Sequence, residues 1–251
     1  MQQKVRDIYN GIMAMTLMSL SGTLALLLRL LSFGLLTDFC RSVVIANSSR
    51  LILRLLGIKL ILPPPSAFPK EQVLYTFNHN YYLDVLIITA LGLQNTRFFL
   101  SEKTRKIIPL TISALAIGTL YIPMKKSRRR RRRFFQAAAG RVRTEGCSVF
   151  ASSEGVHEFV HGIAPFNKGI YHLALTCGLP VVPVYFHVPE EINPLEQFSF
   201  RKGTVRVEVL EPIDTRNWEV LQLRQHVNEV RQRFIKKYND AHGIRQKEVA
   251  S

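Results

Sequence analysis

Short apolar runs alternate with longer, helix-periodic segments along the chain beyond residue 66. The apolar runs are rich in β-branched and aromatic residues and predict strands at Val73–Phe77, Arg97–Leu100, Thr119–Ile122, Ser148–Ala151, Val181–Phe186 and Thr204–Leu210. The segments between them predict helices at Leu83–Leu91, Arg128–Arg143, Gly169–Thr176 and Trp218–Tyr238. Strands that alternate with helices favour an α/β fold with a mixed central β-sheet flanked by helices.

The first part of the chain is apolar and lacks this alternation. Gly11–Leu28 is an uncharged apolar run, about as long as the shortest helix that spans a bilayer. Leu30–Leu36 resumes it, and Leu51–Leu62 adds an amphipathic segment. We expect residues 1–62 to form N-terminal membrane-anchoring helices, either one spanning helix or a pair lying in one leaflet, with a buried core helix as the alternative. No small-residue cleavage pattern follows, so a cleaved signal peptide is not expected.

A proline-rich break, Pro63-Pro64-Pro65-Ser66, separates this segment from an α/β domain expected over residues 63–251. Inside the domain, Ile107–Ile122 is apolar enough to imitate a second spanning helix. Pro109 and Gly118 interrupt it, however, and it falls within the strand–helix alternation. We therefore expect a helix and a strand there, packed in the core or touching the membrane surface.

Composition narrows the expected partners. A net charge of +16 at pH 7 accompanies 47% hydrophobic residues and a mean hydropathy of +0.07. A chain that is both basic and apolar favours anionic lipid, a phosphorylated ligand or an acidic carrier protein. No helix-turn-helix, RNA-binding or zinc-finger pattern is present, so nucleic acid is not expected. Cys40, Cys147 and Cys177 are far apart and odd in number, which favours a reducing compartment, and no metal-ligand spacing predicts a metal.

The run Arg128–Arg133 would crowd the N-terminal end of a predicted helix. Positive charge there opposes the helix dipole by about 0.3–1 kcal/mol per residue. A solvated charged face is the simplest interpretation. An anionic partner, however, would offset both the unfavourable interaction of the arginines with the helix dipole and their repulsion of one another. We hypothesise that Arg128, Arg129 and Arg130 bind an acyl donor's phosphates, a membrane surface or an acidic carrier. The same charge favours the cytoplasmic face of the membrane for this domain.

A candidate for proton transfer lies in Asn78-His79-Asn80-Tyr81-Tyr82-Leu83-Asp84, directly after a predicted strand. In an unbroken helix, His79 and Asp84 would lie about 140° apart. They can meet if His79 stays on the loop and Asp84 falls in the first turn of the next helix. The carboxylate would then accept the imidazole N–H and raise the basicity of the ring, which suits a general base. A structural histidine beside a helix-start aspartate is the alternative.

Three later segments add candidate binding residues. Glu154 and Gly155 follow a predicted strand, where glycine lets the backbone approach a ligand and the carboxylate can accept hydrogen bonds. Pro165-Phe166-Asn167-Lys168-Gly169 then leads into a helix, and Pro180-Val181-Val182-Pro183-Val184 begins a buried strand.

In order and spacing, these segments resemble the glycerolipid acyltransferase family, typified by 1-acylglycerol-3-phosphate acyltransferase. The resemblance runs from about Leu62 to Thr215. The family's blocks are N-H-x-S-x-x-D, G-x-x-F-I-x-R, F-P-E-G-T-R followed by F-K-K-G, and P-x-V-P-V. Asn78, His79 and Asp84 match the first block, and Gly118–Ile122 matches the second. The third block is matched by Glu154 and Gly155, followed by Phe166, Lys168 and Gly169. Pro180–Val184 matches the fourth block.

The resemblance implies a membrane-bound O-acyltransferase of phospholipid biosynthesis or remodelling. It would transfer a fatty acyl chain from acyl-CoA or acyl carrier protein to the hydroxyl of a lysophospholipid or related lyso-lipid, with no further cofactor. His79 would act as the base and Asp84 would orient it, without a covalent acyl-enzyme.

The resemblance also implies roles for the other matched residues. Glu154 and Gly155 would shape the acceptor site, and Lys168 would join the arginines in binding the donor or the membrane. Asn78, Pro180 and Val181 would support either the bound acyl chain or the sheet itself.

The chain departs from the family pattern mainly where the acceptor would bind. Tyr81 replaces the serine of the first block, and Ser152-Ser153 replaces the Phe-Pro before Glu154. Pro123-Met124 and Val156-His157 stand where the family carries its phosphate-contacting arginines. Lys125, Lys126 or Arg128 could substitute for the missing arginines, and His157 is left to contact the acceptor headgroup. A lyso-lipid other than lysophosphatidic acid therefore fits the pattern. A CoA-independent phospholipid transacylase and a non-catalytic membrane-binding protein of the same fold are the alternatives.

Overall fold

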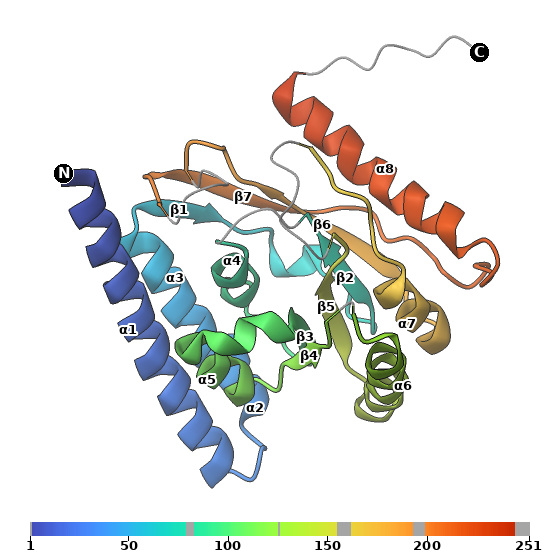
Figure 1. Ribbon diagram of the computed structural model, residues 1–251, viewed down its shortest axis with the longest axis horizontal. Helices are drawn as coiled ribbons and strands as arrows, with labels where there is room; N and C mark the ends of the chain where they lie inside the picture. The colour runs from blue at the N-terminus through green and yellow to red at the C-terminus, as the bar shows by residue number, and fades with distance from the viewer. Residues whose placement is uncertain (1, 79–82, 125, 155–161, 193–198, 244–251) are drawn as a thin grey trace.

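The computed structural model describes residues 2–78, 83–124, 126–154, 162–192 and 199–243, which form a sheet enclosed by helices (Figure 1). The strands are β1 (Ile58–Ile61), β2 (Leu74–Phe77), β3 (Thr96–Ser101), β4 (Leu120–Ile122), β5 (Ser148–Ser152), β6 (Val181–His187) and β7 (Gly203–Val209). They form one seven-stranded sheet in the order β1-β7-β6-β2-β5-β3-β4. Strands β2 to β6 run parallel, whereas β7 is antiparallel to β6 and parallel to β1. The mixed α/β sheet predicted from the sequence is confirmed.

Helices cover both faces of this sheet. One face carries α1 (Gln2–Leu31), α2 (Thr37–Phe39), the π-helix η1 (Cys40–Ile45), α3 (Ala46–Leu55), α4 (Asp84–Ala90) and α5 (Ile108–Ala116). The other face carries α6 (Arg128–Glu145), α7 (Gly169–Cys177) and α8 (Leu223–His242). Two short 3₁₀ helices, η2 (Pro65–Ala67) and η3 (Glu102–Lys106), lie in connections.

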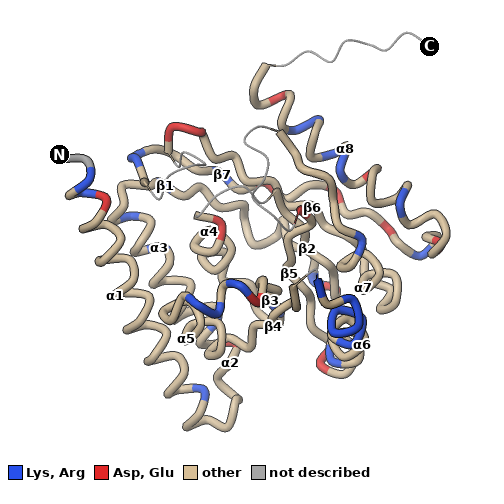
Figure 2. Tube along the Cα trace, in the orientation of Figure 1, with Lys and Arg blue, Asp and Glu red and all other residues tan. Residues whose placement is uncertain are grey.

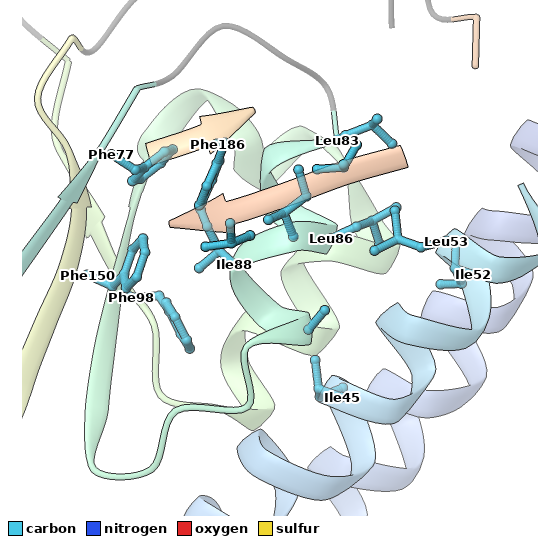
Figure 3. Close-up of a cluster of buried hydrophobic side chains, with 14 of the residues drawn as sticks. Ile45, Ile52, Leu53, Phe77, Leu83, Leu86, Ile88, Phe98, Phe150 and Phe186 are labelled. Atoms are coloured by element: carbon cyan, nitrogen blue, oxygen red, sulfur yellow. The ribbon is translucent and has the colours of Figure 1, made fainter. Parts of the chain in front are cut away.

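The two cores follow from the alternation of side chains along the strands. In β2, Tyr75 and Phe77 point to the α4 face, whereas Leu74 points to the α7 face. Figure 3 shows the first core, in which α4 side chains lie between α3 and a group of phenylalanines on the sheet. A fully buried leucine such as Leu83 or Leu53 contributes about 1.5–3 kcal/mol by leaving water.

The N-terminal helix α1 is apolar on both its packed and its open sides. Its segment Lys4–Leu31 is long and apolar enough to cross a membrane by length and composition. Along one side α1 packs on α5, where Ser113 Oγ donates to the carbonyl oxygen of Met18 at 3.2 Å beside Gly22. Its other side is open, and the exposed apolar residues there are Val5, Ile8, Tyr9, Ile12, Leu20, Leu24, Leu27, Leu30 and Leu31.

Two predicted elements differ from the structure, and a third is confirmed. The expectation that residues 1–62 are helical is wrong at its end, because α3 ends at Leu55 and Ile58–Ile61 forms β1 beside β7. Gly57 takes a φ of 78°, which ends the helix and turns the chain into the sheet. The last helix begins at Leu223 rather than Trp218, because the Trp218 N–H donates to Thr215 in a preceding turn. Ile107–Ile122 divides into α5 and β4, as predicted.

Candidate active site

Asp84 is the first residue of α4, the helix that follows β2 in the chain. Its side chain is fully buried, with 0% exposed, at a helix N-terminus where the helix dipole favours negative charge. This is the first-turn position predicted for the partner of the histidine. His79 itself lies outside the described residues, so the pairing of the two side chains stays a prediction.

Asn78 fixes the end of β2 against β6. Its Nδ2 donates to the carbonyl oxygen of Phe186 at 3.0 Å, and its Oδ1 accepts the Phe186 N–H at 2.8 Å. The side chain is only 3% exposed, so both hydrogen bonds are shielded from water. The amide therefore holds the backbone of the residue that directly precedes His79.

Strands β2 and β5 are neighbours that send the chain to opposite faces of the sheet. After β2 the chain enters α4 on one face, and after β5 it enters α7 on the other (Figure 1). Open α/β sheets bind ligands in a crevice at the carboxyl ends of their strands, at a point where neighbouring connections diverge in this way. Asp84 begins the helix reached from β2, and Glu154 begins the connection that leaves β5.

Glu154 is held in place by the segment that returns toward α7. The carboxylate is 1% exposed, and its Oε2 accepts the N–H of Ala164 at 2.9 Å. Arg231 of α8 in turn donates to the carbonyl oxygens of Ala164 at 2.9 Å and Ile163 at 2.6 Å. A cation on α8 thus fixes the peptide that binds the Glu154 carboxylate.

Ser153 anchors the junction between the end of β5 and the segment that leads into α7, through a network of buried hydroxyl groups. Its Oγ shares hydrogen bonds with Thr76 Oγ1 and, at 2.7 Å, with the phenol of Tyr171. Burial raises the pKa of Tyr171, so the phenol keeps its proton. Asn167 closes the junction by donating its Nδ2 to the carbonyl oxygens of Ser153 at 3.1 Å and Glu154 at 2.7 Å.

Pro180 and Val181 lie at the opposite edge of the sheet, at the start of β6. The Pro180 carbonyl accepts the N–H of Leu74 at 2.9 Å, and Val181 is bridged to Ile213. These contacts fit support of the sheet, which is one of the two roles expected of the pair. The expected contact with an acyl chain stays a prediction.

A second cluster of polar groups lies at the end of β6. Nε2 of His187 lies 2.9 Å from Oε2 of Glu208, and Lys237 donates to Oε1 of the same carboxylate. Burial raises the pKa of Glu208, but the hydrogen bonds from Lys237 and His187 outweigh it and leave that pKa below its ordinary value.

The predicted basic residues are exposed. Lys126 precedes α6, Arg128, Arg129 and Arg130 form its first turn, and Lys168 precedes α7. Four further candidates, His79, Lys125, Gly155 and His157, lie outside the described residues. Within the part of the chain that is described, no three His, Cys, Asp or Glu side chains gather as a metal site would require.

Sequence reasoning missed several residues that hold this region together. Ser153 and Asn167 fell within quoted motifs without a role, and their buried hydrogen bonds depend on the fold. Arg231 gives no local signal, because an arginine on an amphipathic helix is ordinary until the helix is docked.

Comparison with known proteins places the chain among acyltransferases. A family model described as Acyltransferase matches residues 62–187. An uncharacterised acyltransferase of Schizosaccharomyces pombe is 26% identical over 154 residues, which is 58% of this chain and 52% of that protein. A 1-acyl-sn-glycerol-3-phosphate acyltransferase of Haemophilus influenzae is 23% identical over 145 residues, 57% of this chain and 59% of that protein. The matched segments span about half the length of these curated relatives.

A solved structure shares the whole fold. The crystal structure of the 1-acyl-sn-glycerophosphate (LPA) acyltransferase PlsC from Thermotoga maritima superposes with a TM-score of 0.76 over 94% of this chain and 95% of that chain. Its sequence identity is 18%, so the likeness concerns the fold.

Proposed function

The chain belongs to the acyltransferase family, and from this membership we propose that it transfers a fatty acyl chain from a thioester donor to the hydroxyl of a lyso-lipid. The donor would be acyl-CoA or acyl carrier protein. The observation that carries the proposal is the burial of Asp84 and Glu154 where β2 and β5 send the chain to opposite faces. Two buried carboxylates beside a crevice at this position suit a proton-transfer site.

The chemistry would be a direct transfer. The acceptor hydroxyl oxygen attacks the thioester carbonyl carbon while His79 takes the hydroxyl proton. The ester C–O bond forms, the C–S bond breaks, and the proton passes from the imidazolium to the departing thiolate. Asp84 holds the imidazole tautomer and stabilises its charged form, and the hydrogen bonds of Asn78 keep the preceding backbone in place.

For the acceptor we propose a lysophospholipid whose headgroup is a phosphodiester. Glu154 would accept a hydrogen bond from a hydroxyl of the acceptor, because its carboxylate follows the carboxyl end of β5. Pro123 and Met124 occupy the positions where the family carries an arginine that binds phosphate through two hydrogen bonds. A phosphodiester carries one negative charge fewer than a doubly ionised phosphate monoester. A single cation such as Lys126 would therefore suffice to bind its phosphate in place of the arginine.

We also propose that α1 anchors the protein in a membrane, with the α/β domain on the cytoplasmic face. The exposed apolar side of α1 and the basic charge of the domain support this placement. The division of the chain into an anchor and an acyltransferase domain near residue 62 is part of the same proposal. Alkaline extraction of membranes and protease protection of sealed vesicles would test it.

The proposed chemistry is tested with the purified full chain, a radiolabelled acyl-CoA and a panel of lyso-lipids. We expect thioester-dependent acylation of one headgroup class, which His79→Ala and Asp84→Asn each abolish. Asp240→Asn, the same change at an exposed position of α8, is the matched control and should retain activity. Near-normal turnover in either crevice variant would contradict the proposed base pair. Acylation from phospholipid without thioester would instead identify a transacylase, and no turnover with any donor a binding protein.

A further inference from the structure

Two basic segments that are far apart in the sequence meet at the carboxyl ends of β3 and β4. The first is η3, which carries three cations, and the second is the arginine-rich start of α6 (Figure 2). Arg130 Nη2 donates to Glu102 Oε1 at 2.8 Å and so joins the two segments. We call the outward side of this junction the arginine surface, defined by residues 103–108, Met124, Lys126, Arg128, Arg129 and Arg132.

The cations of this surface form no ion pair with a carboxylate among the described residues. Glu102 is the one acidic residue between positions 101 and 144, and Arg130 already pairs with it. Arg131 is held by the carbonyl oxygen of Pro123 at 3.0 Å. In contrast, Arg128 and Arg129 are exposed and form no ion pair with a carboxylate of the described residues. Their like charges repel one another and oppose the dipole of α6, so a ligand of opposite charge would be favoured.

Apolar side chains are exposed beside these cations. Ile107 is 41% exposed, Ile108 is 69% exposed and Met124 is 42% exposed. They adjoin the basic segments in the chain, at the end of η3 and just before α6. Free phosphate or a nucleic-acid backbone would leave these apolar groups in water, whereas a bilayer binds cations at its headgroups and apolar side chains below them.

Distance separates this surface from the crevice. Strands β5 and β3 lie between β2 and β4 in the sheet order, which places the end of β4 about 14 Å from the end of β2. Both features nevertheless lie on the same edge of the sheet, because β2 to β5 are parallel.

We propose that the arginine surface docks on the anionic phosphate headgroups of a membrane leaflet, with Ile107, Ile108 and Met124 entering the boundary between headgroups and acyl chains. Docking in this way turns the carboxyl edge of the sheet, and with it the crevice, toward the leaflet. A lyso-lipid would then reach the crevice without leaving the membrane. The docking goes beyond the proposed chemistry and can be measured whether or not acyl transfer is found.

The test uses tryptophan quenching in lipid vesicles. The full chain contains a single tryptophan, Trp218, so the unaltered protein supplies the background for a Met124→Trp variant. Vesicles carry brominated phosphatidylglycerol or, at equal mole fraction, brominated phosphatidylcholine. We expect the added tryptophan to be quenched severalfold more by the anionic lipid, with the difference lost in 1 M salt. Ile108→Trp is the second reporter if Met124→Trp does not fold.

Charge variants decide whether the arginines cause the preference. Replacing Arg128, Arg129 and Arg132 together by glutamine should weaken the anionic-lipid component of binding on the order of 100-fold. The matched control changes Arg224, Arg233 and Lys236 of α8 to glutamine, removes the same charge and should leave most of the preference intact. Equal quenching by both lipids would overturn the proposal, as would an unchanged preference in the arginine variant. Tighter binding of DNA than of anionic vesicles at the same salt would also overturn it.

Discussion

Replacing Asn78 by aspartate removes one of two buried hydrogen bonds at the candidate site and leaves the shape of the side chain unchanged. In the native chain the amide donates to the Phe186 carbonyl at 3.0 Å and accepts its N–H at 2.8 Å. A carboxylate keeps the second bond, but it turns an acceptor toward the carbonyl oxygen. A buried carbonyl that loses its donor costs about 1–3 kcal/mol, and burial of the new charge adds to this at neutral pH.

We therefore expect Asn78→Asp to lower the free energy of unfolding by about 3 kcal/mol at pH 7. For a chain of this length, that corresponds to a fall of roughly 6–12 °C in the melting temperature. Thermal unfolding of the purified protein in mild detergent measures the change. Asn228→Asp, the same substitution at an exposed position of α8, is the control and should change stability by less than about 0.5 kcal/mol.

The dependence on pH separates this explanation from a general packing defect. Burial raises the folded-state pKa of the new carboxyl above its unfolded value, so the destabilisation is small at acid pH and grows as the pH rises. Once protonated, the carboxyl can donate to the Phe186 carbonyl and restore the hydrogen bond that the carboxylate had lost. A stability difference that stays constant between pH 4 and pH 8 would refute the reasoning. Acyl transfer should fall as well, because the backbone before His79 loses a constraint.

Three further predictions follow from contacts elsewhere in the fold. Arg231→Met should raise the KM for the lyso-lipid about tenfold and leave the KM for the donor unchanged, because it frees the Ile163–Ala164 peptide whose N–H binds Glu154, the carboxylate that we propose contacts the acceptor. A loss confined to kcat would contradict this. Gly22→Val should lower the free energy of unfolding, measured by thermal unfolding, by about 1–3 kcal/mol, because a Cβ there would lie 2.5 Å from Ser113 Oγ. An unchanged melting temperature would show that α1 does not pack on α5 in solution. Glu208→Gln should destabilise the protein at pH 7, and progressively less as the pH falls below the ordinary pKa of a carboxyl group. The reason is that the carboxylate, whose pKa is lowered in the fold, stabilises the protein only while it is ionised. A pH-independent effect in urea unfolding would exclude that cause.

The sequence was most informative where the signal is local. The alternation of apolar runs with helical periods predicted β2 to β7 and most helices to within a few residues, because side-chain burial repeats along each element. The order of the family blocks indicated the acyltransferase family, which the comparisons confirm. The expectation that Asp84 begins a helix after a strand is also confirmed. Its pairing with His79 remains a prediction.

Only the tertiary structure decided which of these elements meet. Strands β2 and β5 are neighbours in the sheet, and the helices that follow them, α4 and α7, pack on opposite faces. Asn78 binds Phe186 across 108 positions, and Arg130 reaches Glu102 across 28. Periodicity reports which side of an element is buried but not which element covers it, so the sequence showed an arginine run and a histidine–aspartate spacing as separate features. Parallel strands bring their carboxyl ends to one edge, and this physical constraint unites the candidate site and the arginine surface.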